Sequence, residues 1–293
     1  LKEQIRAQGG DPQRETLDFV CAKSGEPYFI DSFGEYWRAY HFVEDAYALE
    51  EVKDPQDFYE SAVAFGNFQR MLADFPADTL TETIAGFHDT KARFAAFEKA
   101  VEEDVCGRAA GVKEEIRFIK DRYDVACVLG DLLEAGELPL RVTHNDTKSN
   151  NVLMDNATGK GLCVIDLDTV MPGLAVNDFG DSIRFGASTG AEDEKDLSKI
   201  SCDMELYDIY AKGFVEGCGG ALTDMEIECL PIGAKVMTYE CGMRFLTDYL
   251  SGDTYFKVDY PTHNLDRTRT QLKLVWDMEQ KLSEMKAIVE KYK

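Results

Sequence analysis

The sequence contains few positively charged residues for its length. Its 293 residues include 32 Lys and Arg against 55 Asp and Glu, which gives a formal net charge of −23 at pH 7. Nucleic acids are bound by basic surface that neutralises their phosphates, and anionic membranes attract the same kind of surface. We therefore expect neither a nucleic acid nor a membrane as a partner.

Long apolar runs, leader patterns and clustered metal ligands are also missing. No run reaches the length of about eighteen apolar residues that a transmembrane helix needs, and no signal-peptide pattern opens the chain. The eight cysteines form no C-x-x-C pair and the four histidines are scattered, so we expect no zinc site. We predict a cytoplasmic protein whose cysteines are reduced and mostly buried.

The most informative feature that is present is the polar run 144–151, His-Asn-Asp-Thr-Lys-Ser-Asn-Asn. Asp146 and Asn151 have the Asp-to-Asn spacing of the kinase loop H-R-D-L-x-x-x-N. Phosphoryl transfer needs a carboxylate that orients the attacking hydroxyl. We therefore predict that Asp146 is catalytic and that Lys148 acts as a point charge near the transferred phosphate. A surface turn with a solvated lysine is the alternative.

Two short apolar runs, 152–154 and 162–165, follow this loop and are separated by the turn-forming residues 155–161. This pattern predicts a β-hairpin that returns the chain to Asp166, beside the loop. Asn151 and Asp166 would then converge on one magnesium ion. Mg²⁺ favours few carboxylates, retained waters and phosphate oxygens, so we predict these two residues as its ligands.

The first part of the chain is predicted to be β-rich. Segments 16–21, 28–30 and 36–43 are rich in β-formers and separated by turns, which predicts an antiparallel meander. Residues 1–7 look helical and end at a glycine pair. No Walker sequence and no glycine-rich phosphate loop with a strand-borne lysine occurs in the chain. Because the chain also starts inside a helix, we expect that an upstream segment precedes Leu1.

The rest of the chain is predicted to be mainly helical. Apolar residues recur at steps of three and four, and capping signals appear at Asp54 and at Thr223 to Glu226. Helices are predicted over 54–75, about 91–104, 112–133, 193–214, 223–250 and 265–292. Residues 44–46 would form a hinge between a β-rich part, 1–45, and a helical part, 46–293.

These motifs resemble those of the aminoglycoside phosphotransferase and choline kinase superfamily, which has a protein-kinase-like fold. The resemblance includes the loop 144–151, the Ile165-Asp166 pair and Asp178, twelve residues beyond Asp166. Within the superfamily the chain looks most like the N-acetylhexosamine 1-kinases. Seven stretches carry this likeness: 34–38, 42–46, 86–90, 165–172, 178–182, 240–249 and 263–267.

The resemblance implies an α+β fold with a partial β-rich N-lobe, whose front strands are missing, and a large helical C-lobe that carries the catalytic hairpin. It implies an ATP-dependent, Mg²⁺-requiring kinase that phosphorylates the anomeric hydroxyl of GlcNAc or GalNAc. Asp178 would brace the catalytic loop. The implied adenine-contacting hinge is Phe42, Val43, Glu44 and Asp45. The implied substrate-binding residues are Asp168, which could serve the metal instead, Thr169, Phe185, Arg244 and Tyr255.

Two other functions stay open at this point. The negative charge would also favour a cationic acceptor such as an aminoglycoside or choline. Against this, the chain ends in 290–293 Glu-Lys-Tyr-Lys, where an aminoglycoside would need acidic residues, and Trp37 and Trp276 are its only tryptophans for a choline cage. A non-catalytic hexosamine-binding pseudokinase is the second alternative. The intact Asp146, Asn151 and Asp166 argue against it.

Plain structural roles are the alternative for three of the implied substrate residues. Arg244 could pair with Glu240, four residues earlier on the same helix. Phe185 and Tyr255 could be packing residues.

Overall fold

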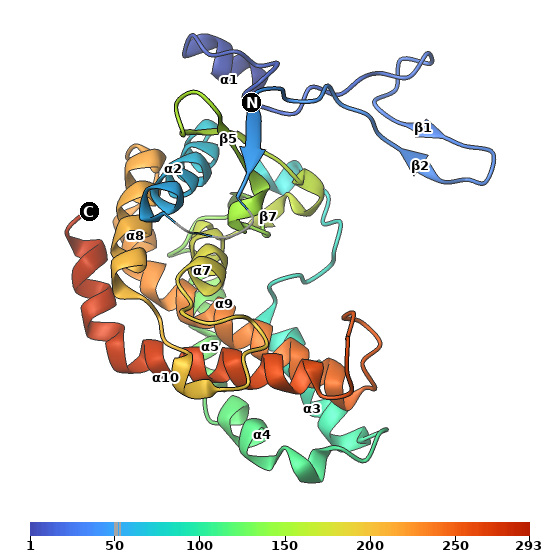
Figure 1. Ribbon diagram of the computed structural model, residues 1–293, viewed down its shortest axis with the longest axis vertical. Helices are drawn as coiled ribbons and strands as arrows, with labels where there is room; N and C mark the ends of the chain where they lie inside the picture. The colour runs from blue at the N-terminus through green and yellow to red at the C-terminus, as the bar shows by residue number, and fades with distance from the viewer. Residues whose placement is uncertain (50–51, 53) are drawn as a thin grey trace.

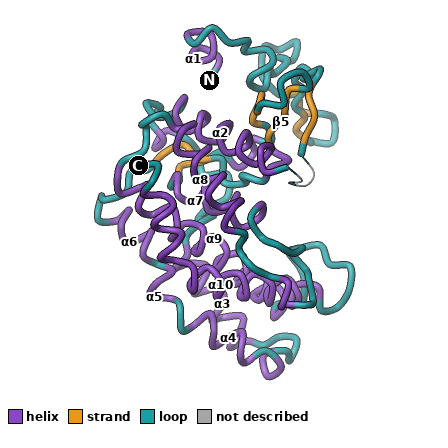
Figure 2. The backbone as a smooth tube through the Cα atoms, turned by 60° about the vertical axis from the view of Figure 1, so that its left-hand side comes forward, coloured by secondary structure: helices purple, strands orange, loops and turns teal. Residues whose placement is uncertain are grey.

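The computed structural model describes residues 1–49, 52 and 54–293. A small β-containing part occupies one end of the molecule, and the long helices form a larger body beneath it (Figure 1). Figure 2 shows the same division, with the strands gathered near the end that also carries the first helix. This arrangement is the α+β, protein-kinase-like architecture that the sequence predicts.

The N-terminal region contains less sheet than predicted. Helix α1 (Lys2–Ala7) is followed by a ribbon of two short antiparallel strands, β1 (Phe29–Ile30) and β2 (Tyr36–Trp37), which projects from the body (Figure 1). The predicted strands 16–21 and 36–43 are reduced to β2 and a single bridge between Phe19 and Tyr40. A two-stranded ribbon that packs on nothing is only marginally stable, which explains the short pairing.

A three-stranded antiparallel sheet contains the predicted hairpin. Its strands are β3 (Ala46–Ala48), β5 (Val152–Asp155) and β6 (Gly161–Val164), in that spatial order. The hairpin prediction is confirmed, whereas β3 was not predicted as a strand. Because Ala46 pairs with Asp155, the last residue of the predicted hinge 44–46 lies beside the end of the catalytic hairpin.

The large core lies among five helices: α2 (Pro55–Met71), α7 (Ala175–Gly186), α8 (Met204–Cys218), α9 (Asp224–Leu250) and α10 (His263–Glu290). Aromatic side chains fill its centre, and they include Phe58, Phe179, Tyr207, Tyr210 and Phe214. The predicted capping residues act as expected. Asp54 accepts a hydrogen bond from the Gln56 N–H, and Thr223 and Glu226 form a capping box.

Three helix predictions differ from the structure. The predicted helix 112–133 is divided into α4 (Lys113–Lys120), α5 (Tyr123–Ala126) and α6 (Val128–Glu134). At the first break, Arg122 donates back to the Phe118 carbonyl and also binds Glu279 of α10. The predicted helix 193–214 begins only at Met204, because Asp203 caps it and Asp277 of α10 accepts the Cys202 N–H.

The third difference is α7, which was not predicted. Its apolar residues Val176, Phe179 and Ile183 recur at helical steps, but the polar residues between them are buried as well, and all but one residue of the helix is buried. Helix α3 (Thr90–Glu103) agrees with its prediction. Strands β4 (Arg141–Thr143) and β7 (Met171–Gly173) form a separate antiparallel pair on either side of the catalytic hairpin in sequence.

Short 3₁₀ helices complete the described elements: η1 (Ala77–Thr79), η2 (Ala109–Gly111), η3 (Ser149–Asn151), η4 (Leu167–Thr169) and η5 (Leu197–Lys199). In the part of the chain that the structure describes, no helix combines the length and apolar character needed to cross a bilayer.

Helices α7 and α9 approach each other so closely that their backbones touch. A Cβ atom added to Gly180 would lie 2.4 Å from the Gly233 carbonyl oxygen, and one added to Gly233 would lie 2.2 Å from that of Val176. Side chains cannot fit at either position without moving a helix. Since α7 carries residues that hold the catalytic loop, this contact positions the site.

We expect Gly180→Ala to destabilise the protein by about 1–3 kcal/mol, because the added methyl group overpacks the helix contact. Urea unfolding would measure the change. Gly130→Ala in α6 is the matched control: its Cβ would meet nothing within 4 Å, and replacing a helical glycine should stabilise by about 0.5–1 kcal/mol. Equal stability of Gly180→Ala and the wild type would contradict this packing.

Candidate active site

The loop 144–151 is held from behind by the carboxylate of Asp178 on α7. One oxygen accepts the His144 N–H and the other accepts the Asn145 N–H, each at 2.8 Å, and Gln69 of α2 donates to it at 2.7 Å. Burial raises the pKa of the Asp178 carboxyl, and the hydrogen bonds from the loop oppose this effect. The bracing position expected for Asp178 is therefore what the structure shows.

A second carboxylate on the same helix, Asp181, holds the middle of the loop. It accepts the Thr147 N–H at 3.0 Å, and the Arg184 guanidinium donates to its other oxygen at 3.0 and 3.1 Å. Ser182 donates its hydroxyl to the Thr147 carbonyl at 2.7 Å. Burial opposes ionisation of Asp181, but the charge of Arg184 outweighs it and holds the pKa below its ordinary value.

The three polar side chains predicted in this loop lie together. Lys148 Nζ is 2.9 Å from Asp146 Oδ1. Asn151 donates its amide to the Asp146 carbonyl at 2.8 Å and to Asp146 Oδ2 at 3.3 Å. Burial disfavours the charge of Lys148, but the hydrogen bond with Asp146 more than compensates and raises the lysine pKa. The loop thus presents a carboxylate between a cation and an amide.

Asp166 lies next to this group through the backbone. The Ile165 N–H donates to the Asn151 carbonyl at 2.9 Å, and His144 Nε2 lies 2.8 Å from the Ile165 carbonyl. Asp166 itself is exposed and has a positive φ of 57°, a strained conformation that is frequent at functional sites. Because Asn151 uses its NH₂ group towards Asp146, its Oδ1 is the atom left for a ligand. One amide oxygen and one carboxylate suit a hard cation such as Mg²⁺ that keeps waters.

The predicted hinge lies at the sheet and outside the cavity described below. Val43 is buried, whereas Phe42 is 82% exposed. The Glu44 carbonyl accepts a hydrogen bond from Arg14, and the Asp45 carbonyl accepts one from the Asn156 N–H at 2.9 Å. The hinge is therefore tied to the turn of the catalytic hairpin.

A cavity of about 460 Å³ opens beside Asp146 and Lys148. It contains three of the predicted substrate residues: Thr169, Arg244 and Tyr255. Thr169 donates its hydroxyl to the His144 carbonyl at 2.7 Å, which links this wall to the catalytic loop. The sequence-based grouping of these positions agrees with one shared cavity.

Arg244 lies among aromatic rings in this cavity. Its guanidinium carbon is 5.4 Å from the ring centre of Phe87, 5.8 Å from that of Tyr255 and 5.5 Å from that of Phe256. It does not pair with Glu240, which instead contacts His88 at 3.1 Å and Thr90 at 3.2 Å. The alternative helix pair is therefore absent, and cation–π contacts hold the guanidinium in place.

Two predicted substrate residues lie elsewhere. Asp168 is exposed, does not line the cavity and forms an ion pair with Arg38. Phe185 lines a different cavity of about 400 Å³. Successive helical residues are separated by about 100° around the axis, so Arg184 can face the catalytic cavity while Phe185 faces away. The structure thus does not bring these two residues to Asp146.

Several side chains in the site were not singled out from the sequence. Asp181, Arg184, Phe87 and His88 either line the cavity or hold its loop. They fall within or close to the stretches 86–90 and 178–182 that carry the family likeness, which is the signal that could have indicated them. Their roles depend on contacts with residues far along the chain, 152 positions for His88 and Glu240 and 34 for Asp181 and Thr147, which local patterns do not predict.

The fold is protein-kinase-like, and the family match identifies a phosphotransferase. Residues 15–209 match the sequence model of the Phosphotransferase enzyme family, and the chain belongs to that family.

Solved structures agree at the level of the fold. A microcompartment-associated aminopropanol kinase is 17% identical, with a TM-score of 0.62 over 97% of this chain and 79% of that one. An aminoglycoside phosphotransferase from Alicyclobacillus acidocaldarius is 14% identical, with a TM-score of 0.61 over 99% and 81%. A spectinomycin phosphotransferase in complex with ADP and spectinomycin is 13% identical, with a TM-score of 0.54 over 95% and 82%.

We expect Asp178→Asn to lower stability by about 1–3 kcal/mol, because one loop N–H would face an NH₂ donor in place of an oxygen. Turnover should fall about a hundredfold as the loop moves. Urea unfolding and a phosphate-transfer assay measure the two effects. Asp124→Asn, at an exposed position on α5, is the control and should change neither. Normal turnover of Asp178→Asn would show that the brace is dispensable.

Proposed function

We propose that this phosphotransferase is an ATP-dependent kinase that phosphorylates the anomeric hydroxyl of an N-acetylhexosamine, GlcNAc or GalNAc. The supporting observation is the cavity that begins at Asp146 and ends at the aromatic rings around Arg244. Tyr255 and Phe256 offer flat apolar surface to one face of a sugar ring. The Arg244 guanidinium has donors and no acceptor, so it suits the carbonyl of an acetamido group and ring hydroxyls.

The charges of this cavity favour a neutral acceptor over a cationic one. Each carboxylate in its wall already has a partner in the described structure: Asp146 has Lys148, Asp181 and Glu192 have Arg184, and Glu240 has His88. Arg244 and Lys257 have no carboxylate partner among the described residues. A choline or aminoglycoside cation would therefore enter next to unpaired positive charge, although the chain as a whole carries −23.

In the proposed reaction the hexosamine O1 attacks the γ-phosphorus of ATP, and the bond from that phosphorus to the ADP oxygen breaks. Asp146 orients the O1 hydroxyl and takes its proton, while Lys148 lies near the transferred phosphoryl group. Asn151 and Asp166 would hold magnesium, which neutralises phosphate charge. Positioning and charge neutralisation supply most of the catalysis in such a loose transition state.

The spectinomycin phosphotransferase of similar fold binds ADP, and we extend nucleotide binding to this chain. Residues 42–45 are proposed as the adenine-contacting hinge between an N-lobe, 1–45, and a C-lobe, 46–293. The Glu44 carbonyl is engaged by Arg14 here, so Arg14 would move if that carbonyl accepted from adenine.

We expect the wild-type enzyme to convert GlcNAc, ATP and Mg²⁺ to the sugar 1-phosphate, which ³¹P NMR identifies. Asp146→Asn should lower turnover at least about a hundredfold, because a positioned general base contributes that much. 1-Deoxy-GlcNAc lacks the reacting hydroxyl and should yield no product. Phosphorylation of kanamycin or choline but not of GlcNAc would contradict the proposed acceptor.

Arg244→Leu should raise the KM for the hexosamine about tenfold or more, because hydrogen bonds from a charged donor are lost. The KM for ATP should stay unchanged, since Arg244 lies in the acceptor cavity. Steady-state kinetics with each substrate varied in turn separates the two. Arg269→Leu is the matched control: its guanidinium pairs with Glu115 and does not line the cavity. An unchanged sugar KM would remove Arg244 from the acceptor site.

A further inference from the structure

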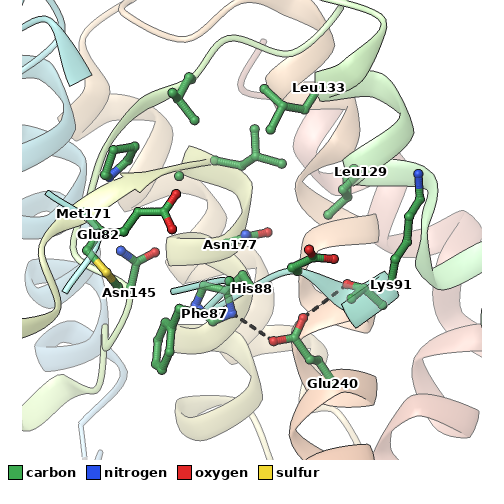
Figure 3. A pocket seen from close by; sticks show the side chains of 18 of the residues that line it. Glu82, Phe87, His88, Lys91, Leu129, Leu133, Asn145, Met171, Asn177 and Glu240 are labelled. Atoms are coloured by element: carbon green, nitrogen blue, oxygen red, sulfur yellow. Dashed lines mark hydrogen bonds and ion pairs between the residues drawn. The ribbon is translucent and has the colours of Figure 1, made fainter. Parts of the chain in front are cut away.

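A second cavity lies beside the acceptor cavity and is larger, at about 680 Å³. The two cavities share a wall made of Ile84, Phe87, His88, Asn145 and Glu240. Figure 3 shows this second cavity between the 82–91 segment, β7 and the helices that carry Leu129 and Glu240. None of the functions assigned above uses it.

Asn177 on the first turn of α7 is a buried polar side chain that lines this cavity. It is 7% exposed, and its amide makes no hydrogen bond to any residue that the structure describes. In Figure 3 the amide lies in the middle of the lining groups, with Glu82 on one side and His88 and Glu240 on the other. Because the amide atoms are not fully enclosed and line the cavity, they are available to a ligand that enters it.

The charges around Asn177 are the reverse of those in the acceptor cavity. Five carboxylates line the second cavity: Asp78, Glu82, Asp89, Glu134 and Glu240. The two basic side chains in the lining contact two of these carboxylates, Lys91 with Glu134 at 2.9 Å (and with Asp131 at 2.8 Å) and His88 with Glu240. Asp78, Glu82 and Asp89 have no basic partner among the described residues. A positive ligand would therefore be attracted into this space.

The remaining walls are apolar. They include Leu129 and Leu133 of α6, Val236 of α9, and Leu174 and Met171 near the start of α7. We propose that this cavity is a second binding site, separate from the acceptor site, for an aliphatic amine with an apolar body. Asn177 Oδ1 and the neighbouring carboxylates accept hydrogen bonds from the ammonium groups, and the methylene chain packs on the apolar walls.

The test is calorimetric titration of the full chain with 1,5-diaminopentane, which has no hydroxyl and so cannot be a phosphate acceptor. Glutarate, of the same length and opposite charge, is the control ligand and should not bind. Asn177→Leu should weaken diamine binding about tenfold or more, the effect of losing a hydrogen bond to a charged group. This change leaves the net charge at −23, so non-specific ionic attraction would survive it.

Asn156→Leu, at an exposed position in the turn of the catalytic hairpin, is the matched control and should bind as the wild type does. Glu82→Gln, at another exposed position, keeps the proposal testable if Asn177→Leu does not fold, and should weaken binding about threefold or more. No diamine binding by the wild type would overturn the proposal, as would wild-type affinity of the two cavity variants. Competition by GlcNAc would place the amine in the acceptor cavity instead. Because the readout is binding, failure of the kinase proposal leaves this result unaffected.

Discussion

The whole site depends on one buried carboxylate that accepts two adjacent backbone N–H groups of the catalytic loop. Asp178 fixes the loop just before Asp146, and Asp181, one helical turn later, fixes it just after. Both carboxylates belong to α7, whose position is set by backbone contact with α9 through Gly180 and Gly233. The geometry of the loop therefore depends directly on how the large helical body packs. Phosphoryl transfer requires that its positioning groups are held rigidly.

The two neighbouring cavities differ in the charge that they present to a ligand, because their charged side chains are paired differently. Next to the catalytic loop, Lys148 and Arg184 pair with carboxylates and His88 contacts Glu240, while Arg244 has no carboxylate partner among the described residues. In the second cavity, carboxylates outnumber the basic side chains Lys91 and His88. They lie around the Asn177 amide, which has no side-chain hydrogen bond to the described residues. A chain with a strong net negative charge can thus still present a locally positive reaction site, because local pairing outweighs the average charge at short range.

Short-range sequence patterns correctly predicted the helices and strands that depend on residues close together in the chain. The hairpin after the catalytic loop, the caps of α2 and α9, and the stripe of α10 depend on residues a few positions apart, and these predictions are confirmed. The predictions that were wrong have distant causes. Arg122 binds Glu279 of α10 at the break between α4 and α5, and Asp277 of α10 accepts the Cys202 N–H just before α8 begins. The strands predicted before residue 44 form only a two-stranded pair among the described residues.

The sequence by itself determined that Asp146, Lys148 and Asn151 lie in one loop, since their spacing is fixed by a few covalent bonds. It also indicated Thr169, Arg244 and Tyr255 as one group. Only the tertiary structure decided which side chains line which cavity. Arg244 lies among aromatic rings, Phe185 lines another cavity, and Asn177 is buried with no side-chain hydrogen bond to the residues that the structure describes. The orientation of these three side chains depends on how helices from distant parts of the chain are rotated and packed against one another. Residue spacing within one segment does not contain that information.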